Sequence, residues 1–443
     1  MTNPKQLINL ITQSLNNLTT KHEMKILLKN AIYLNWQTLE FKHTNIIVDG
    51  NNVQFVDDSQ IPQEKFDIID CAGKIVTKSF VVGHHHAYSA LARGMGAPKK
   101  NPTNFHEILK YVWWTLDKCL NKDMVEYSGL VTAMACAKSG ATFAIDHHAS
   151  PFAVKGSLDI LSKAFDTVGV GHLLCYEISD RDGDKIAQEG LDETDAYLSK
   201  NQGLVGLHAS FTLSDETLKK ASDLMQKHKS GVHIHVAEDT YDQEHCIETY
   251  NSSVVERLNG FGMLNSSKSI LVHCLHLSDR ERELIGKSPC WVAQNTDSNL
   301  NNNVGYFDST GLGKNLMLGT DGMHSDMLQS MKSAYFVGQN FDPMGPAQAY
   351  ERLRNAHRYL ASNGFNGDGD NNLVVLDYNS PTPINSGNVL GHLVYAINST
   401  HIHDVISNGK VIVRNRKLTT VDEDIIHNES KKLAQYLWEC MAK

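Results

Sequence analysis

Residues 269–322 read SILVHCLHLSDRERELIGKSPCWVAQNTDSNLNNNVGYFDSTGLGKNLMLGTDG. Three short apolar runs stand in this stretch, at 269–277, 290–295 and 315–322, and polar segments of loop or helix length separate them. The same rhythm continues toward the N-terminus and adds five apolar runs, at 75–83, 141–146, 171–177, 203–210 and 231–238. Eight runs that alternate with helix-length amphipathic segments predict an α/β fold of the (β/α)₈, TIM-like barrel type.

The two ends of the chain show a different pattern. Short alternating segments with Asn, Gly and Asp between them predict β-strands before residue 73 and again after residue 371, and residues 422–440 predict a final helix. We therefore expect a barrel over residues 74–370 and one small β-sandwich domain assembled from residues 24–73 plus 371–443. The Gly-rich stretch 363–372 would link them. Residues 1–23, with an amphipathic stretch at 6–18, are expected to form a helical extension.

Composition and charge exclude several classes of protein. The chain has 443 residues, of which 41% are hydrophobic and 21% charged, as in globular proteins. A net charge of -9 argues against a nucleic-acid partner, and no apolar segment suits a membrane span or a signal peptide. The eight cysteines contain no CxxC pair, which favours a reducing cytoplasm over a disulfide framework. A small-molecule substrate is the expected partner.

Nine of the 22 histidines stand in clusters in or after the apolar runs, at positions 84–86, 147–148, 233/235 and 273/276. His84 and His86 are two residues apart, so on a strand both side chains point to the same face. His233 and His235 have the same spacing, and the position nearer the strand end favours His235. An HxH pattern is a weak signal by itself, since a histidine-rich loop without ligands has the same sequence. Catalytic groups of barrels nevertheless come from these strand ends.

Three further residues stand at corresponding positions. Glu238 follows the fifth run, His273 lies within the sixth, and Asp321 follows the eighth. Individually, these residues could be a loop carboxylate, a core histidine and a helix cap. Their joint occurrence predicts a site with three imidazoles and one carboxylate. Such a set suits Zn²⁺, with Fe²⁺ or Mn²⁺ as alternatives. A metal ion lowers the pKa of a bound water to about 7, which supplies hydroxide at neutral pH.

Together these motifs resemble a known family. HxH, HVAE, VHCLHLSD, NTDSN and LGTDG stand in the order and spacing of the amidohydrolase superfamily, in its chlorohydrolase/cytosine-deaminase-like (ATZ/TRZ) branch. HHHAYSALARGM, IDHHASP and CYEISDRDG are most similar to the SsnA-like aminohydrolases. The resemblance covers nearly the whole chain after residue 24. It implies a hydrolase that acts on C–N bonds, with a homodimer as the possible assembly.

The resemblance also implies roles for individual residues. Glu238 would carry a proton to the leaving group, and His273 would orient the attacking hydroxide and polarise the scissile bond. Asp321 would accept the proton of the attacking water, and His208 would contact the substrate. A binuclear branch has a carboxylated lysine where this chain has His208, so one metal ion is expected. Its ligands would be His84, His86, His235 and Asp321.

Two departures from the family pattern stand beside these matches. Lys78-Ser79 replaces a Pro-Gly before the first strand, and Gln294-Asn295-Thr296 replaces a His-Asn-Pro on the substrate side. Trp113 and Trp114 could line the mouth of the barrel, but aromatic residues on a helix more often belong to the core, which is the interpretation we favour. Further groups could reach a substrate, namely Arg93, Asp146, His147, His148 and Glu177.

Three functional hypotheses remain open at this point. The first is hydrolytic deamination of a purine, pyrimidine or triazine-like ring. The second is hydrolysis of another C–N bond, in a cyclic amide or guanidine-type compound, or of a C–Cl bond. The third, a non-catalytic metal-binding barrel, has no use for Glu238 and His273. A zinc deaminase of the base-flipping type would carry a P-C-x-x-C signature, which the sequence lacks.

Overall fold

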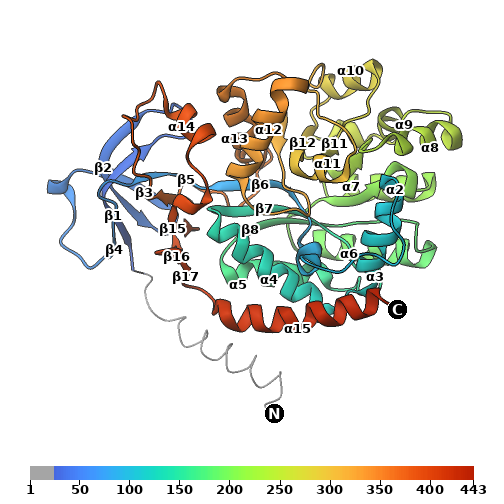
Figure 1. Ribbon diagram of the computed structural model, residues 1–443, viewed down its shortest axis with the longest axis horizontal. Coiled ribbons are helices and arrows are strands. Elements are labelled where there is room, and N and C mark those ends of the chain that lie inside the picture. Colours follow the sequence, from blue (N-terminus) through green and yellow to red (C-terminus); the bar gives the residue numbers. More distant parts are fainter. Residues whose placement is uncertain (1–23) are drawn as a thin grey trace, which may run out of the picture.

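The computed structural model describes residues 24–443, so the expected N-terminal helical extension lies outside the described residues. Eight parallel strands form the body of the molecule (Figure 1). They are β6 (Phe80–His85), β7 (Ala141–His148), β8 (Gly171–Tyr176), β9 (Val205–Ala209), β10 (Val232–Val236), β11 (Ile270–His273), β12 (Trp291–Gln294) and β13 (Leu316–Leu318).

Backbone pairing closes these strands into a barrel. One ladder joins β6, β7 and β8, and a second joins β9 through β13. Single parallel bridges connect β8 to β9 at Leu174–Gly203 and β6 to the end of β13 at His85–Asp321. The predicted (β/α)₈ barrel is therefore confirmed, and its closing bridge joins two of the segments that carry candidate ligands.

Apolar side chains fill the barrel, and one glycine sets its closure. Val81, Phe143, Leu173, Val272 and Met317 belong to one buried cluster that strands around the barrel supply, as expected for the packed interior of this fold. A Cβ atom at Gly83 would stand 2.5 Å from the carbonyl oxygen of Leu318. Glycine here lets β6 and β13 approach closely, directly before His84.

Helices surround the barrel and connect its strands (Figure 1). Short polar caps start several of them: Ser278 and Glu281 form a capping box on α10, and Asn121 accepts a hydrogen bond from Met124 N at the start of α4. The helices are α4 (Lys122–Lys138), α5 (Ser157–Val168), α6 (Asp184–Leu198), α7 (Asp215–Lys227), α8 (Thr240–Tyr250), α9 (Val254–Gly260), α10 (Asp279–Lys287), α11 (Thr296–Asn302), α12 (Met327–Phe341) and α13 (Pro346–Ser362).

A second sheet combines both ends of the chain and lies beside the barrel (Figure 1). Its strand order is β17-β16-β15-β14-β5-β1-β2-β3, with β4 paired to β1. The two-layer sandwich expected for this region stays a prediction. The bounds are β1 (Ile26–Leu34), β2 (Phe41–Asp49), β3 (Asn52–Val56), β4 (Asp67–Asp70), β5 (Ile75–Lys78), β14 (Leu373–Leu376), β15 (Ile402–Ser407), β16 (Lys410–Arg414) and β17 (Lys417–Leu418), with α14 (Val389–Tyr395) between β14 and β15.

The first apolar run divides between the two sheets. Residues 75–83 were expected to form one barrel strand, but β5 pairs with β1 and β14, and only β6 enters the barrel. The change occurs at Ser79. Its N–H donates to the carbonyl of Asn372, whereas the next N–H, that of Phe80, donates to Gly140. Hydropathy is the same on both sides of this point, so the sequence pattern contained no boundary.

The last helix, α15 (Glu423–Met441), confirms the helix predicted at 422–440, but it packs on the barrel helices α4 and α3 (Trp114–Cys119). Trp438 Nε1 donates to the carbonyl of Leu91 at 2.9 Å. Cys119 and Cys440 form a disulfide, which the expectation of a reducing cytoplasm rather than a disulfide framework did not include. The two cysteines are 321 residues apart, and only the docking of α15 brings them together.

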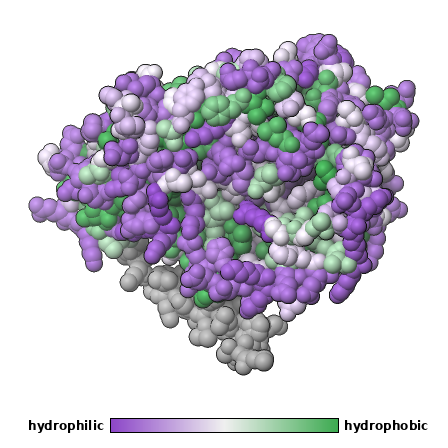
Figure 2. Space-filling model, viewed as in Figure 1, coloured by the Kyte–Doolittle hydropathy of each residue, from purple (hydrophilic) through white to green (hydrophobic). Residues whose placement is uncertain are grey.

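Hydrophilic side chains cover most of the face shown in Figure 2, with apolar ones scattered between them. Among residues 24–443, no helix has both the length and the apolar character needed to cross a membrane.

Candidate active site

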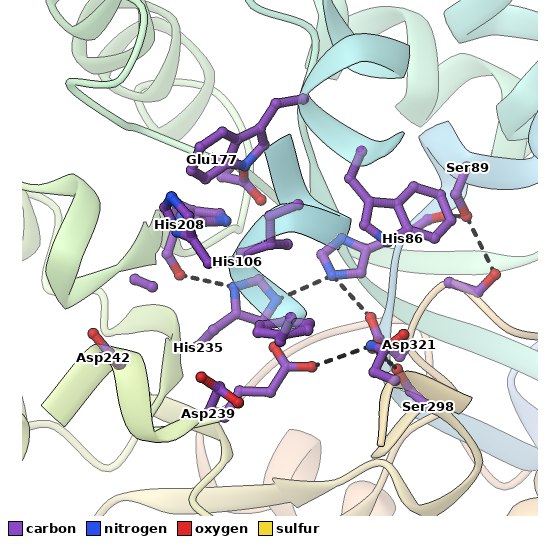
Figure 3. Close-up of a pocket in the computed structure, with 18 of the residues that line it drawn as sticks. His86, Ser89, His106, Glu177, His208, His235, Asp239, Asp242, Ser298 and Asp321 are labelled. Atoms are coloured by element: carbon purple, nitrogen blue, oxygen red, sulfur yellow. Dashed lines mark hydrogen bonds and ion pairs between the residues drawn. The ribbon is translucent and has the colours of Figure 1, made fainter. Parts of the chain in front are cut away.

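The four predicted ligands meet at the carboxyl ends of the barrel strands. His84 lies in β6, His86 follows it, His235 lies in β10, and Asp321 follows β13. Each offers one ligand atom, and these atoms all lie within 4.8 Å of one another. His84 Nε2 and His86 Nε2 are 3.5 and 3.0 Å from Asp321 Oδ1. His86 Nε2 is also 3.0 Å from His235 Nε2 (Figure 3).

The opposite ring nitrogens fix the orientation of each imidazole. His86 Nδ1 donates to the carbonyl of His147 at 2.7 Å, and His235 Nδ1 donates to the carbonyl of His208 at 2.8 Å. His84 Nδ1 is hydrogen-bonded to His233 Nε2 at 2.9 Å. A second hydrogen bond of this kind is the usual way in which proteins hold a metal-ligating histidine. His233, the unchosen member of the HIH pair, thus supports His84.

The arrangement passes a test of fit for a divalent cation. With Nδ1 of His86 and His235 as donors, the neutral rings direct Nε2 lone pairs at one point. His84 Nε2 is buried and has no hydrogen-bond partner among residues 24–443. Nitrogens about 2.0–2.1 Å from one tetrahedral zinc ion would stand about 3.3 Å apart. The distance of 3.0 Å between His86 Nε2 and His235 Nε2 is close to that spacing, and so is the N···O distance of 3.5 Å between His84 Nε2 and Asp321 Oδ1.

Left-handed backbone turns place several of these groups. His273 has φ of 67°, Asp321 has φ of 53°, and Ala237, directly before Glu238, has φ of 45°. The left-handed backbone conformation costs a non-glycine residue on the order of 1–3 kcal/mol, and such strain concentrates at functional sites. Here the turns lie at the ends of β10, β11 and β13.

Glu238 and His273 stand beside the ligand group. Glu238 Oε2 is 3.4 Å from His273 Nε2, which in turn is 3.9 Å from Asp321 Oδ2. His273 Nδ1 donates to Asn299 Oδ1 at 2.8 Å, so the neutral ring keeps an Nε2 lone pair toward the two carboxylates. Burial, together with the charge of Asp321, holds the pKa of Glu238 well above its ordinary range. Glu238 is therefore set up to carry a proton.

A pocket that is open to solvent leads to this group. It brings in two residues predicted to contact substrate, His208 and Glu177. Trp113 and Trp114 also line it while they pack against the hydrophobic core, so both alternatives considered for them apply. The cause is the segment 105–119, where α2 (Phe105–Ile108), a π-helical turn (Leu109–Trp113) and α3 follow one another above the barrel. Hydropathy alone does not distinguish an aromatic pocket wall from core.

The other residues considered as possible substrate contacts do not line the pocket. Asp146 accepts a hydrogen bond from Ala87 N at 2.6 Å, and His147 Nε2 donates to the carbonyls of Leu207 and His233. Arg93 is exposed and is not part of the pocket lining. Gln294 was placed on the substrate side, but its Oε1 accepts from Arg352 Nη1 at 2.8 Å and it lies outside the pocket lining.

Sequence reasoning missed several lining residues, namely Arg181, Phe211, His106, Tyr241 and Asn302. Arg181 stands in the CYEISDRDG motif, which was the one available signal. The others come from loops and helix ends without a pattern of their own.

Buried His148 leads to a prediction for acid stability. It is fully buried, with Nε2 hydrogen-bonded to Ser150 Oγ at 2.8 Å, and burial lowers its pKa from 6.5 to about 4. The unfolded chain therefore binds this proton below pH 6.5, whereas the folded chain does not bind it until about pH 4. Relative to His148→Gln, the wild type should lose about 1.4 kcal/mol of unfolding free energy per pH unit in that window. Urea titrations of the wild type and of His148→Gln at pH 7.5, 6.5 and 5.5 measure this difference. An unfolding free energy that changes equally with pH in the two proteins would contradict the prediction.

An α/β barrel that brings three imidazoles and a carboxylate within 4.8 Å of one another, with a further glutamate beside them, has the residue set of a metal-dependent hydrolase. The model of the amidohydrolase family matches residues 75–354, more than half of the chain, and the chain belongs to this family.

Relatives and a solved structure agree with this assignment. A 5'-deoxyadenosine deaminase of Methanococcus maripaludis is 27% identical over 428 residues, covering 91% of this chain and 97% of the relative. A 5-methylthioadenosine/S-adenosylhomocysteine deaminase of Thermoanaerobacter pseudethanolicus is 26% identical, covering 92% and 98%. The crystal structure of an adenosine deaminase from Xanthomonas campestris with bound zinc superposes with a TM-score of 0.79 at 16% identity, covering 93% and 98%. At this identity, the superposition shows the shared fold.

Proposed function

We propose that this protein catalyses the hydrolytic deamination of an amino-substituted nitrogen heterocycle and releases ammonia. The observation that carries the proposal is the meeting of Glu238 and His273 with Asp321, itself one of the four candidate ligands, at an aromatic-lined pocket. A metal store would need the ligands alone. The names of the two relatives, which are deaminases of adenosine derivatives, support the same reaction.

His84, His86, His235 and Asp321 would hold one divalent cation. Three imidazoles and a carboxylate suit zinc best, with Fe²⁺ or Mn²⁺ as alternatives. The ion, when bound, supplies the Lewis acidity that makes water nucleophilic at neutral pH. Asp321 is well suited to its place, because Ser298 Oγ donates to Asp321 Oδ2 and leaves Oδ1 facing His84 and His86.

The chain's own residues would move the protons. The lone pair of His273 Nε2 orients the attacking water, and Asp321 Oδ2, 3.9 Å away, accepts the proton that this water gives up. Glu238 then donates a proton to the exocyclic amine, so that ammonia rather than an amide anion leaves. The raised pKa of Glu238 keeps that proton available at neutral pH.

An ammonia-release assay tests this function. We expect metal-loaded protein, with one ion per chain, to release ammonia from at least one ring in a panel of aminated purines, pyrimidines and triazines. Chelation should abolish the release, and zinc should restore it. Bound metal with no ammonia from any ring would instead favour hydrolysis of a cyclic amide or a C–Cl bond. Protein that binds no metal would contradict the proposal.

A further inference from the structure

One buried carboxylate of the pocket is not accounted for by the proposed chemistry. Glu177 follows β8 and lines the pocket, with only 2% of its side chain exposed. Its Oε2 is 3.3 Å from His147 Nδ1, and its Oε1 is 3.5 Å from Arg181 Nη1. Charge-assisted N–H···O bonds are about 2.7–2.9 Å long, so both contacts are loose. A carboxylate offers about four acceptor positions, and Glu177 therefore keeps acceptor capacity for a ligand.

The charges around Glu177 determine which ligands fit. Arg181 is the basic side chain of this wall, but it contacts Asp117 and its Nε is 3.2 Å from Asp182 Oδ2. Its charge is thus already paired with carboxylates and is not free for an anion. Among the residues that line the pocket, Arg181 is the one Lys or Arg, and Glu177 and Asp239 are acidic residues without a ligand role. The pocket consequently favours N–H donors or a positive charge over a phosphate or carboxylate.

Aromatic rings give the pocket flat walls. Trp114 and Phe211 lie 6.4 Å apart between ring centroids, and Phe211 contacts Tyr241 at 5.3 Å. Such surfaces suit a planar ring that stacks or meets them edge to face. In Figure 3, Glu177 and His208 lie on one side of the pocket, and Asp321 and Ser298 on the other.

Glu177 is also close to the reacting centre. Its carboxylate and one ring nitrogen each of His86 and His147 lie within 4.8 Å of one another. One small ring that donates N–H groups to Glu177 can therefore reach the ligand group with another of its atoms.

We propose that Glu177 anchors the substrate by accepting two adjacent N–H donors, and that the enzyme selects planar rings with an amidine-type or guanidine-type edge. This inference rests on the proposed function and narrows its substrate class. A carboxylate pairs with such an edge through two parallel hydrogen bonds, the geometry known from arginine–carboxylate pairs. Rings that carry a phosphate or carboxylate group should be poor ligands.

Binding of two planar probes to the zinc-loaded full chain tests the anchor. Benzamidine presents the proposed edge with a positive charge, and benzamide has the same shape without the charge. By calorimetry, we expect wild-type protein to bind benzamidine at least about 10-fold more tightly than benzamide. Glu177→Gln should weaken benzamidine binding by roughly 10–100-fold and leave benzamide nearly unchanged. Glu193→Gln is the matched control, because Glu193 is a buried glutamate that accepts N–H groups of Gly156 and Leu158 outside the pocket.

Each result of these binding measurements either supports the proposed anchor or overturns it. Equal affinity of the wild type for the two probes, or unchanged benzamidine affinity in Glu177→Gln, would overturn the proposal. An equal loss in Glu193→Gln would assign the effect to folding and would also overturn it. Because the assay measures binding without turnover, Glu177-dependent binding in a protein that releases no ammonia would contradict the deaminase function alone. Ammonia release without any dependence on Glu177 would contradict the anchor alone.

Discussion

Glu238→Gln is expected to lower kcat by roughly 10²–10⁴-fold, the usual contribution of one positioned acid–base group. Metal content should stay at one ion per chain, because Glu238 is not among the four ligands. Glutamine preserves the shape of the side chain and its contact with Asn302 Nδ2, which is 3.4 Å from Glu238 Oε1. It cannot give a proton to the leaving amine, so the chemical step loses its acid.

The pH profile separates this role from a structural one. A general acid works in its protonated form, so the wild-type rate should decline as pH rises through the pKa of Glu238, which burial and Asp321 raise. The glutamine variant should lack this limb. Glu193→Gln serves again as the control and should keep both the rate and the limb. Turnover in Glu238→Gln equal to the wild type would remove Glu238 from the mechanism.

The sequence predicted those features of the fold that also impose a local sequence pattern. Eight buried parallel strands must be short and apolar, so their number could be read directly, and a barrel site must lie where those strands end. His84, His86, His235 and Asp321 stood at such ends, and the structure brings them together. The spacing of the HIH pair did not choose between His233 and His235, and only the supporting contact to His84 shows how both are used.

What the sequence did not reveal depends on contacts between distant segments. The strand at 75–83 changes sheets because Ser79 meets Asn372, almost 300 residues later. Cys119 meets Cys440 for the same reason. Trp113 and Trp114 have the hydropathy of core residues and pack against the core, and the segment 105–119 also exposes them to the pocket. The local sequence pattern cannot report such contacts, because the sequence around these residues carries no feature that marks the distant partner.

Asp321→Asn is expected to abolish both tight metal binding and turnover. Asp321 is the one ligand of the four that carries a negative charge, and its Oδ1 faces two imidazoles at 3.0 and 3.5 Å. The nearby imidazoles keep its pKa well below the ordinary range despite burial, so the group is charged at neutral pH. Asparagine offers a neutral oxygen of the same size. The variant loses charge neutralisation of the cation and the acceptor for the proton of the attacking water.

Thermal and chemical stability report the loss independently of activity. At free zinc about 100-fold above its Kd, a ligand that binds only the folded chain adds about 2.7 kcal/mol to the free energy of unfolding. We expect this increment in the wild type and in Asp404→Asn, which alters a buried aspartate of the second sheet. Asp321→Asn should show little or none of it at the same zinc concentration. If that variant kept one zinc ion per chain with wild-type affinity, Asp321 would not be a ligand, and the three histidines would have to hold the ion with a different fourth group.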